Sequence, residues 1–200
     1  EENWAGYFYR RSDVNQSTKQ IQAMNRYGVG KVSSGAMVPS SGRYNWSRTG
    51  AGDATSSYSR WNVEAIGGSS SVDFRNVPNT FGWVVEIDPF DIGSTPRKRT
   101  ALGRFGHEGA WPAKAVAGKP VVFYMGDDAR NEYIYKFVSD ALWDTADANG
   151  GLFAGDKYMD AGKLYAVKFN ADGTGTWELL SLSNATVANY ATYTFADAAD

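Results

Sequence analysis

The residues whose types and spacing can support chemistry lie between Leu102 and Asp128. This stretch contains His107, the single histidine of the chain, and Glu108 directly after it. A strand-like apolar run then leads into two adjacent aspartates, at positions 127 and 128. Carboxylates held at the end of a strand can bind a hard cation such as calcium or magnesium, because these ions prefer oxygen ligands. This stretch is therefore the first candidate for a functional site.

The composition restricts the classes of function. The 20 basic and 22 acidic residues give a formal net charge of −2, whereas proteins that bind nucleic acids typically carry an excess of positive charge. No apolar run approaches the roughly 18 residues of a membrane-spanning helix. We therefore expect no nucleic-acid partner and no membrane span.

The sequence also contains no cysteine, which excludes disulfides, thiolate metal ligands and a cysteine nucleophile within these 200 residues. With one histidine, a metal site built from several imidazoles is disfavoured, and a Ser-His-Asp triad would have to use His107. A metal held here would depend mainly on carboxylate and carbonyl oxygens.

The distribution of aromatic and β-branched residues favours an all-β fold. Aromatic residues make up 14% of the chain and occur in short runs between Gly, Asp and Asn, as in proteins with many strands and turns. The similar runs YIYKFV and LYAVKF indicate repeated antiparallel strands, either propeller blades or a meander. Strands are predicted at residues 1–11, 81–88, 99–105, 116–124, 133–138, 164–169 and 176–182, the last two joined by a hairpin across 170–173.

Little helix is expected. Residues 17–27 carry apolar side chains at three-residue spacing after Ser17, a suitable N-cap, and before Gly28, a suitable C-terminal residue. Residues 141–161 are expected to form a loop with one helical turn, and the tail to begin a helix near Phe195.

The segment 28–79 is polar and rich in serine and glycine, yet it contains Tyr44, Trp46, Tyr58 and Trp61. A low-complexity linker would be poorer in tryptophan and tyrosine. We therefore expect a long, partly ordered insertion that serves a site or covers a sheet edge.

Several long motifs resemble the PhoX-type alkaline phosphatases. They are EENWAGYF, GWVVEIDPFD, TPRKRTALGRFGHEGA, VVFYMGDDARNEYIYKFVS and GKLYAVKFNADGTGTWELL, in that order. The resemblance is strong over residues 81–182, fair over 1–8 and poor between them. It implies an antiparallel β-propeller phosphomonoesterase, exported to the periplasm or the cell exterior, that uses iron and calcium in its central channel.

A whole propeller needs more chain than this. The resemblance therefore implies that residues 1–200 form a single partial β-propeller domain, with a long insertion at 28–79, a short helix, and blade strands within 81–182. An iron-binding cysteine is expected before Glu1 and an Arg-Pro-Glu segment after Asp200. This 200-residue piece alone is expected to be inactive.

The resemblance also assigns roles to single residues. Glu108 matches a metal-ligating glutamate of the family, and Glu2 and Asp128 are further candidate ligands. His107 is expected to orient Glu108 rather than to transfer protons. Gly106 stands where family members often have a basic residue, and Arg104 or Lys136 would have to replace that charge.

Other interpretations of the same residues remain open. The Asp127–Asp128 pair is also typical of a turn that satisfies its own backbone amides, and Glu86 fits a structural role. The alternative function is a non-catalytic β module that binds a glycan or a protein partner, with Trp46, Trp61 and Trp111 as an aromatic surface. The expected partners of the phosphatase are a phosphomonoester substrate and, through exposed strand edges, further copies of the chain.

Overall fold

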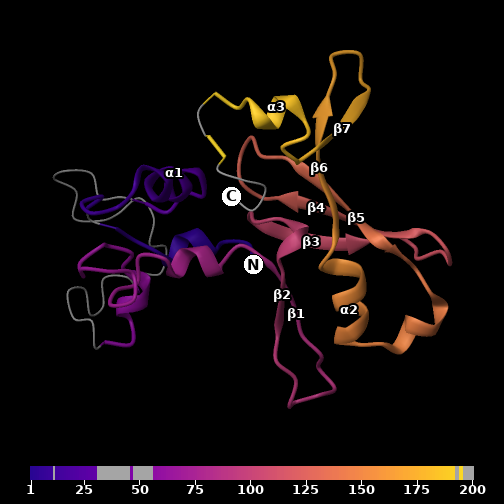
Figure 1. Ribbon diagram of the computed structural model, residues 1–200, viewed down its shortest axis with the longest axis horizontal. Coiled ribbons are helices and arrows are strands. Elements are labelled where there is room, and N and C mark those ends of the chain that lie inside the picture. The colour runs from indigo at the N-terminus through magenta and orange to yellow at the C-terminus, as the bar shows by residue number, and fades with distance from the viewer. Residues whose placement is uncertain (11, 31–45, 47–55, 192–193, 196–200) are drawn as a thin grey trace. The chain divides into compact units, whose positions relative to one another are not determined.

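The computed structural model describes residues 1–10, 12–30, 46, 56–191 and 194–195. The chain divides into two compact units, Glu1–Gly82 (unit 1) and Trp83–Asp200 (unit 2). Figure 1 shows helices and irregular segments in unit 1 and the labelled strands in unit 2. Among the described residues, no helix has the length and apolar character needed to cross a membrane.

Unit 1 begins with a 3-10 helix, η1 (Trp4–Tyr7), where the sequence predicted a strand. The strand prediction was wrong because the small residues at positions 5 and 6 allow a tight turn, closed by a 3.1 Å hydrogen bond from the Phe8 amide to the Ala5 carbonyl. This turn places the rings of Trp4 and Phe8 edge to face, with their centroids 6.4 Å apart. Both side chains are buried in the core of unit 1.

The predicted short helix is confirmed as α1 (Thr18–Arg26). The Ser17 hydroxyl accepts a 3.2 Å hydrogen bond from the Gln20 amide, and the Gln20 side chain accepts one of 2.9 Å from the Ser17 amide. This reciprocal pair is a capping box. Gly28 follows with φ +73°, a conformation that favours glycine at the end of a helix.

The described part of the 28–79 segment contains two short 3-10 helices, η3 (Ser59–Trp61) and η4 (Val77–Thr80). Trp61 packs against Phe8 at 5.3 Å and against Trp46 at 5.6 Å between ring centroids. This confirms that two of the predicted aromatic residues hold the segment to a core, whereas Tyr58 is 44% exposed. Tyr44 lies outside the described residues.

Unit 2 is built from antiparallel strands (Figure 1). A two-stranded sheet pairs β1 (Val84–Glu86) with β2 (Arg97–Arg99). A five-stranded sheet has the order β3-β4-β5-β6-β7, with strand bounds β3 His107–Pro112, β4 Pro120–Asp127, β5 Ile134–Leu142, β6 Gly162–Phe169 and β7 Gly175–Leu179. The all-β prediction is confirmed by these sheets, while the arrangement of blades in a propeller remains a prediction.

Two strand predictions near the candidate site need correction. The strand predicted at 99–105 ends at Arg99 and is followed by the 3-10 helix η5 (Thr100–Leu102). Gly103 then adopts φ +91° and breaks the extended backbone. The next strand, β3, was not predicted, because its sequence HEGAWP contains a glycine and a proline and lacks an apolar alternation.

The segment predicted as a loop at 141–161 is more helical than expected. It forms the 3-10 helix η6 (Thr145–Asn149) and the helix α2 (Leu152–Met159). The buried residues of α2 are Leu152, Gly155 and Tyr158, a three-residue spacing that surrounding glycines and aspartates obscure. A further short helix, α3 (Ala185–Ala188), begins after Asn184. The helix predicted to begin near Phe195 would run through residues 196–200, which lie outside the described residues.

The five-stranded sheet has one buried face and one open face. Residues paired directly across an antiparallel sheet lie on the same face. The buried face contributes Met125, Tyr135, Phe137 and Ala166 to a core that also contains Leu102 and Phe105. The opposite face, which we call the open face, carries the in-register row Trp111, Tyr124, Lys136 and Tyr165.

The predicted hairpin between the last two strands is confirmed as β6–β7. Its turn is closed by a 2.8 Å hydrogen bond from the Asn170 amide to the Thr174 carbonyl. Gly173 has φ +84°, which explains the glycine in the Asp-Gly turn signal.

Candidate functional site

Glu108 occupies a β-bulge on an edge strand. His107 pairs with Asp127 and Gly109 pairs with Gly126, so β3 advances two residues while β4 advances one. Glu108 is the extra residue, and its side chain is exposed. A bulge of this kind re-aims a side chain out of the regular alternation of the strand. Within the described part of the chain, no residue donates a hydrogen bond to the Glu108 carboxylate or forms an ion pair with it.

His107 is held inside the protein beside this glutamate. Its side chain is 6% exposed, and Nε2 lies 3.0 Å from the Gly103 carbonyl oxygen. The imidazole stacks on the Phe105 ring at 3.7 Å between centroids. A buried imidazole bonded to a backbone carbonyl fits a supporting role better than proton exchange with a substrate.

The two aspartates begin the turn between β4 and β5. Oδ1 of Asp127 accepts a 3.0 Å hydrogen bond from the Ala129 amide, so this carboxylate caps its own turn. The Asp128 amide donates a 3.1 Å hydrogen bond to the Gly106 carbonyl, while the Asp128 side chain is exposed. The structure therefore brings Asp128 to the same end of the sheet as Glu108, through a direct backbone link to the residue before His107.

The remaining predicted site residues lie elsewhere. Glu2 belongs to unit 1, where it accepts a 2.6 Å hydrogen bond from Nδ2 of Asn3. Arg104 lies half-buried at a bend between Gly103 and Phe105. These positions leave the predicted roles of Glu2 and Arg104 as predictions.

Lys136 lies in the middle of the open face rather than in the bulge. Its Nζ sits 4.5 Å from the Trp177 ring centroid and 5.0 Å from that of Tyr165. Burial lowers the pKa of Lys136. Because its pairing partner is Tyr124, two residues from the Gly126 that faces the bulge, Lys136 is engaged with aromatic rings away from Glu108.

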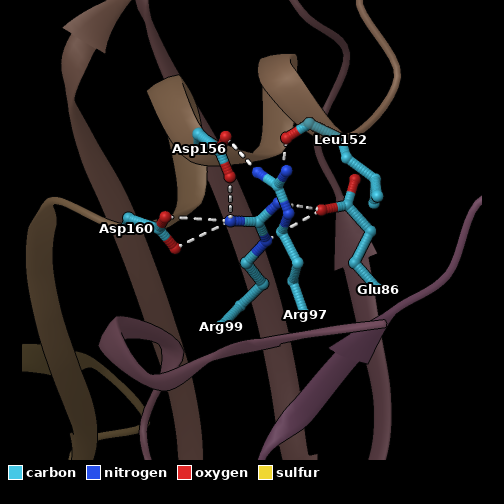
Figure 2. A network of polar contacts seen from close by, with 6 residues as sticks. All are labelled: Glu86, Arg97, Arg99, Leu152, Asp156 and Asp160. Atoms are coloured by element: carbon cyan, nitrogen blue, oxygen red, sulfur yellow. Dashed lines mark hydrogen bonds and ion pairs between the residues drawn. The ribbon is translucent and has the colours of Figure 1, made fainter. Parts of the chain in front are cut away.

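A polar network of unit 2 surrounds Arg99, as Figure 2 shows. Nε of Arg99 donates to Glu86 at 2.7 Å, and Nη1 donates to Asp156 at 2.8 Å and to Asp160 at 2.9 Å. Nη2 donates to the Leu152 carbonyl at 3.0 Å and also to Glu86. Arg97, on the same strand, forms an ion pair with Asp156.

This network is structural rather than a binding site for phosphate. A guanidinium has five N–H donors, and the contacts of Arg99 engage all of them, so none is left for a substrate. Burial lowers the pKa of Arg99, but hydrogen bonds to Asp156, Glu86 and Asp160 outweigh it, so the pKa lies above its ordinary value. Hydrogen bonds from Arg97 and Arg99 hold the pKa of Asp156 below its usual range.

The network fixes the start of the segment that leads to Glu108. Arg99 is the last residue of β2, and η5 follows it directly. The predicted structural role of Glu86 agrees with its hydrogen bonds to Arg99, whereas the sequence does not indicate the role of Arg99 itself. The aspartates at 156 and 160 are four residues apart, a spacing that places two acids on one face of a helix. With a helix assigned at this position, that spacing would predict a basic partner for the two acids.

The sequence pattern of the family described as alkaline phosphatase PhoX matches residues 1–200. The chain belongs to the PhoX family of alkaline phosphatases. A solved structure of Pseudomonas fluorescens PhoX, in complex with vanadate as a transition state analogue, matches with 34% sequence identity and a TM-score of 0.70. The match covers 100% of this chain and 30% of that chain, so this PhoX sequence spans less than a third of the solved relative. No curated protein matches the chain.

The oxygen donors of this PhoX chain fit part of a cation site. Glu108 and Asp128 are exposed carboxylates at one end of the sheet, the donor type that calcium prefers. However, the described residues contain no group of three or more histidine, cysteine, aspartate or glutamate side chains that could hold a metal ion. The described residues can therefore supply individual ligands to a shared metal centre but do not enclose one.

Proposed function

We propose that the chain is part of a secreted, metal-dependent phosphomonoesterase, an alkaline phosphatase, in which Glu108 is a ligand of an iron and calcium cluster. Family membership supports the reaction class, and the vanadate bound by the solved relative is an analogue of a transferring phosphoryl group. We propose a periplasmic or extracellular location, as the resemblance to the family implies. The substrate is then a phosphomonoester.

The observation that carries the role of Glu108 is its place in the bulge. A glutamate on a regular edge strand would alternate with its neighbours, whereas the bulge presents this carboxylate outward beside a buried histidine. Asp128 adds an exposed carboxylate at the same end of the sheet. Glu2 is a further proposed ligand, which the resemblance to the family supports.

A cluster of iron and calcium would neutralise charge on the phosphoryl group and lower the pKa of a bound water. The residues of this chain would provide oxygen ligands from Glu108 and Asp128. His107 would maintain the direction of the strand through its bond to the Gly103 carbonyl. We also propose that Arg104 contributes positive charge near this end of the sheet.

The role of Glu108 is tested by Glu108→Gln in the native-length protein. The variant keeps the shape of the side chain but is a poorer metal ligand, so bound iron or calcium per protein and the hydrolysis of p-nitrophenyl phosphate should both fall. Glu178→Gln, on the opposite edge strand β7, is a matched control that should keep both. A Glu108→Gln protein with unchanged metal content and activity would contradict the proposal.

The polypeptide of residues 1–200, expressed alone, is proposed to be inactive, because it matches only 30% of the solved relative. Calcium-dependent hydrolysis of p-nitrophenyl phosphate by this polypeptide would overturn that expectation. The same assay with the native-length protein provides the positive control.

The open face supports a second candidate function, a β module that binds a glycan. Trp111 is 80% exposed and Tyr124 is 45% exposed, and the two are paired across β3 and β4. Aromatic rings in a row can stack on sugar rings. If this function holds, Trp111→Ala will abolish retention on immobilised polysaccharide while Glu108→Gln will not.

A further inference from the structure

Three aromatic rings form a buried stack that ends at the bulge. The Tyr135 ring lies 4.1 Å from the Phe105 ring at an interplanar angle of 15°. The Phe105 ring in turn lies 3.7 Å from the His107 imidazole at 30°. The three side chains are 7%, 3% and 6% exposed, respectively, so the stack is shielded from water.

The stack joins a central strand of the sheet to an edge strand through a tight turn. Tyr135 belongs to β5, His107 begins β3, and Phe105 lies in the turn before β3. Gly103 opens this turn with φ +91°, and a Cβ there would lie 2.9 Å from Cε1 of Phe105 and 2.8 Å from Cδ2 of Leu164. The turn is therefore packed so closely around the Phe105 ring that a side chain at position 103 would displace it.

His107 is consequently fixed from several directions. Its amide donates a 3.0 Å hydrogen bond to the Phe105 carbonyl, and its ring is held at Nε2 by the Gly103 carbonyl. Its backbone pairs with Asp127. Glu108 is the next residue and, unlike His107 and Gly109, has no pairing partner on β4. The direction of the Glu108 side chain therefore depends on how firmly His107 is held.

We infer that Phe105 and Tyr135 are positioning residues for Glu108. Neither ring reaches the carboxylate; they act through His107, which they hold so that the bulge keeps one geometry. This inference rests on the proposed role of Glu108 as a metal ligand. It adds that the affinity for the metal depends on two buried aromatic rings that carry no ligand atom.

The test replaces each flat ring by a side chain that stays apolar. Phe105→Leu and Tyr135→Leu in the native-length protein should lower the affinity for calcium roughly tenfold, the loss typical when a residue that orients a metal ligand is removed. Tyr135→Phe retains the ring and should keep the affinity of the wild type. Calcium titration followed by calorimetry measures these affinities.

Phe137→Leu is the matched control for lost packing. Phe137 is fully buried in the same core cluster, two residues from Tyr135 on β5, and its ring neighbour is Phe123 at 6.5 Å rather than His107. This variant should lose thermal stability, as Tyr135→Leu should, but should keep the affinity for calcium. The difference between these two variants separates positioning from general destabilisation.

A second measurement covers the case in which a leucine variant folds poorly. Hydrogen exchange of the Asp128 amide, which is bonded to the Gly106 carbonyl, reports the integrity of the turn without any metal. It should be faster in Phe105→Leu than in Phe137→Leu, and unchanged in Tyr135→Phe.

The outcomes distinguish the inference from the proposed function. If Glu108→Gln lowers the affinity for calcium while Phe105→Leu and Tyr135→Leu bind as the wild type does, the inference is wrong and the role of Glu108 stands. If Glu108→Gln binds calcium as the wild type does, the role of Glu108 fails and the inference fails with it. Equal losses in Phe137→Leu and Tyr135→Leu would also overturn the inference.

Discussion

Nη1 of Arg99 donates a 2.8 Å hydrogen bond to Oδ1 of Asp156, a residue 57 positions later in the chain. This contact ties the last residue of β2 to α2, and Asp160 accepts from the same nitrogen one helical turn further on. The Arg99 side chain is 1% exposed. A buried charge destabilises the folded protein unless its ion-pair and hydrogen-bond partners are present.

The first prediction concerns the loss of this guanidinium. Arg99→Met should lower the free energy of unfolding by about 1–3 kcal/mol, because it leaves the buried Leu152 carbonyl and the partly exposed partner carboxylates without their shared donor. Urea denaturation measures the loss. Arg97→Met is the control, since Arg97 is 37% exposed and its ion pair should contribute about 1 kcal/mol or less. Equal losses in both variants would show that the burial of Arg99 is unimportant.

A second prediction concerns Gly155, which lies in α2 against the same network. A Cβ at this position would overlap Oε2 of Glu86 and Nη2 of Arg99, two atoms held by their own hydrogen bonds. Alanine normally favours a helix interior over glycine by about 1 kcal/mol. Gly155→Ala should nevertheless destabilise the protein, as measured by its thermal midpoint.

Gly68→Ala provides the comparison for that substitution. A Cβ at Gly68 meets nothing within 4 Å. This variant should leave the thermal midpoint unchanged or raise it slightly. A Gly155→Ala protein more stable than the wild type would mean that the Arg99 network rearranges at little cost.

The strands of the sheet were predictable because their side chains follow a local pattern. β4 to β7 overlap the predicted runs, and the Asp-Gly turn between β6 and β7 has the backbone conformation that glycine favours. The capped helix α1 was predictable for the same reason, since Ser17 and Gln20 satisfy each other within one turn. Local signals were sufficient where the contacts are local.

The candidate site was predictable only in part. The sequence located Glu108 and His107, but the bulge depends on register with β4, and register is set by pairing across strands rather than by the sequence of β3. Arg99 was missed because its partners are 13 to 61 residues away in the chain. The sequence predicts only that Tyr135 is a strand residue, because its stacking on Phe105 depends on the fold.

A third prediction concerns pH and unit 1. The side-chain hydrogen bond from Arg75 lowers the pKa of Asp73 from 3.8 to about 2. Because the pKa is lower in the folded protein than in the unfolded chain, the stabilisation is complete above roughly pH 4 and is lost as the pH falls towards 2. The expected loss of unfolding free energy across this window is about 2 kcal/mol.

Urea denaturation at about pH 5 and about pH 2.5 measures that loss. Asp73→Asn should be less stable than the wild type at the higher pH, and the difference should be clearly smaller at the lower pH, because the asparagine does not titrate. A constant difference between the two proteins at both pH values would exclude the Asp73–Arg75 pair as the source of the acid sensitivity.

The last prediction concerns self-association of the 200-residue chain. Its sheet ends in the edge strand β3, and the adjoining open face carries Trp111 with 80% of its surface exposed. Unpaired strand edges and exposed aromatic surface both favour association. Sedimentation velocity should show concentration-dependent dimers or larger species, and Trp111→Lys should shift the population towards monomer.

Phe153→Lys is the control for this experiment, because Phe153 is 78% exposed but lies on α2 rather than on the sheet. It should leave the association unchanged. If both lysine variants weaken association equally, exposed aromatic area in general drives it and the sheet has no special role. If the wild-type chain is monomeric at every concentration, its open face and its edge strand β3 are stable in contact with water. That result would weaken the interpretation of unit 2 as part of a larger propeller.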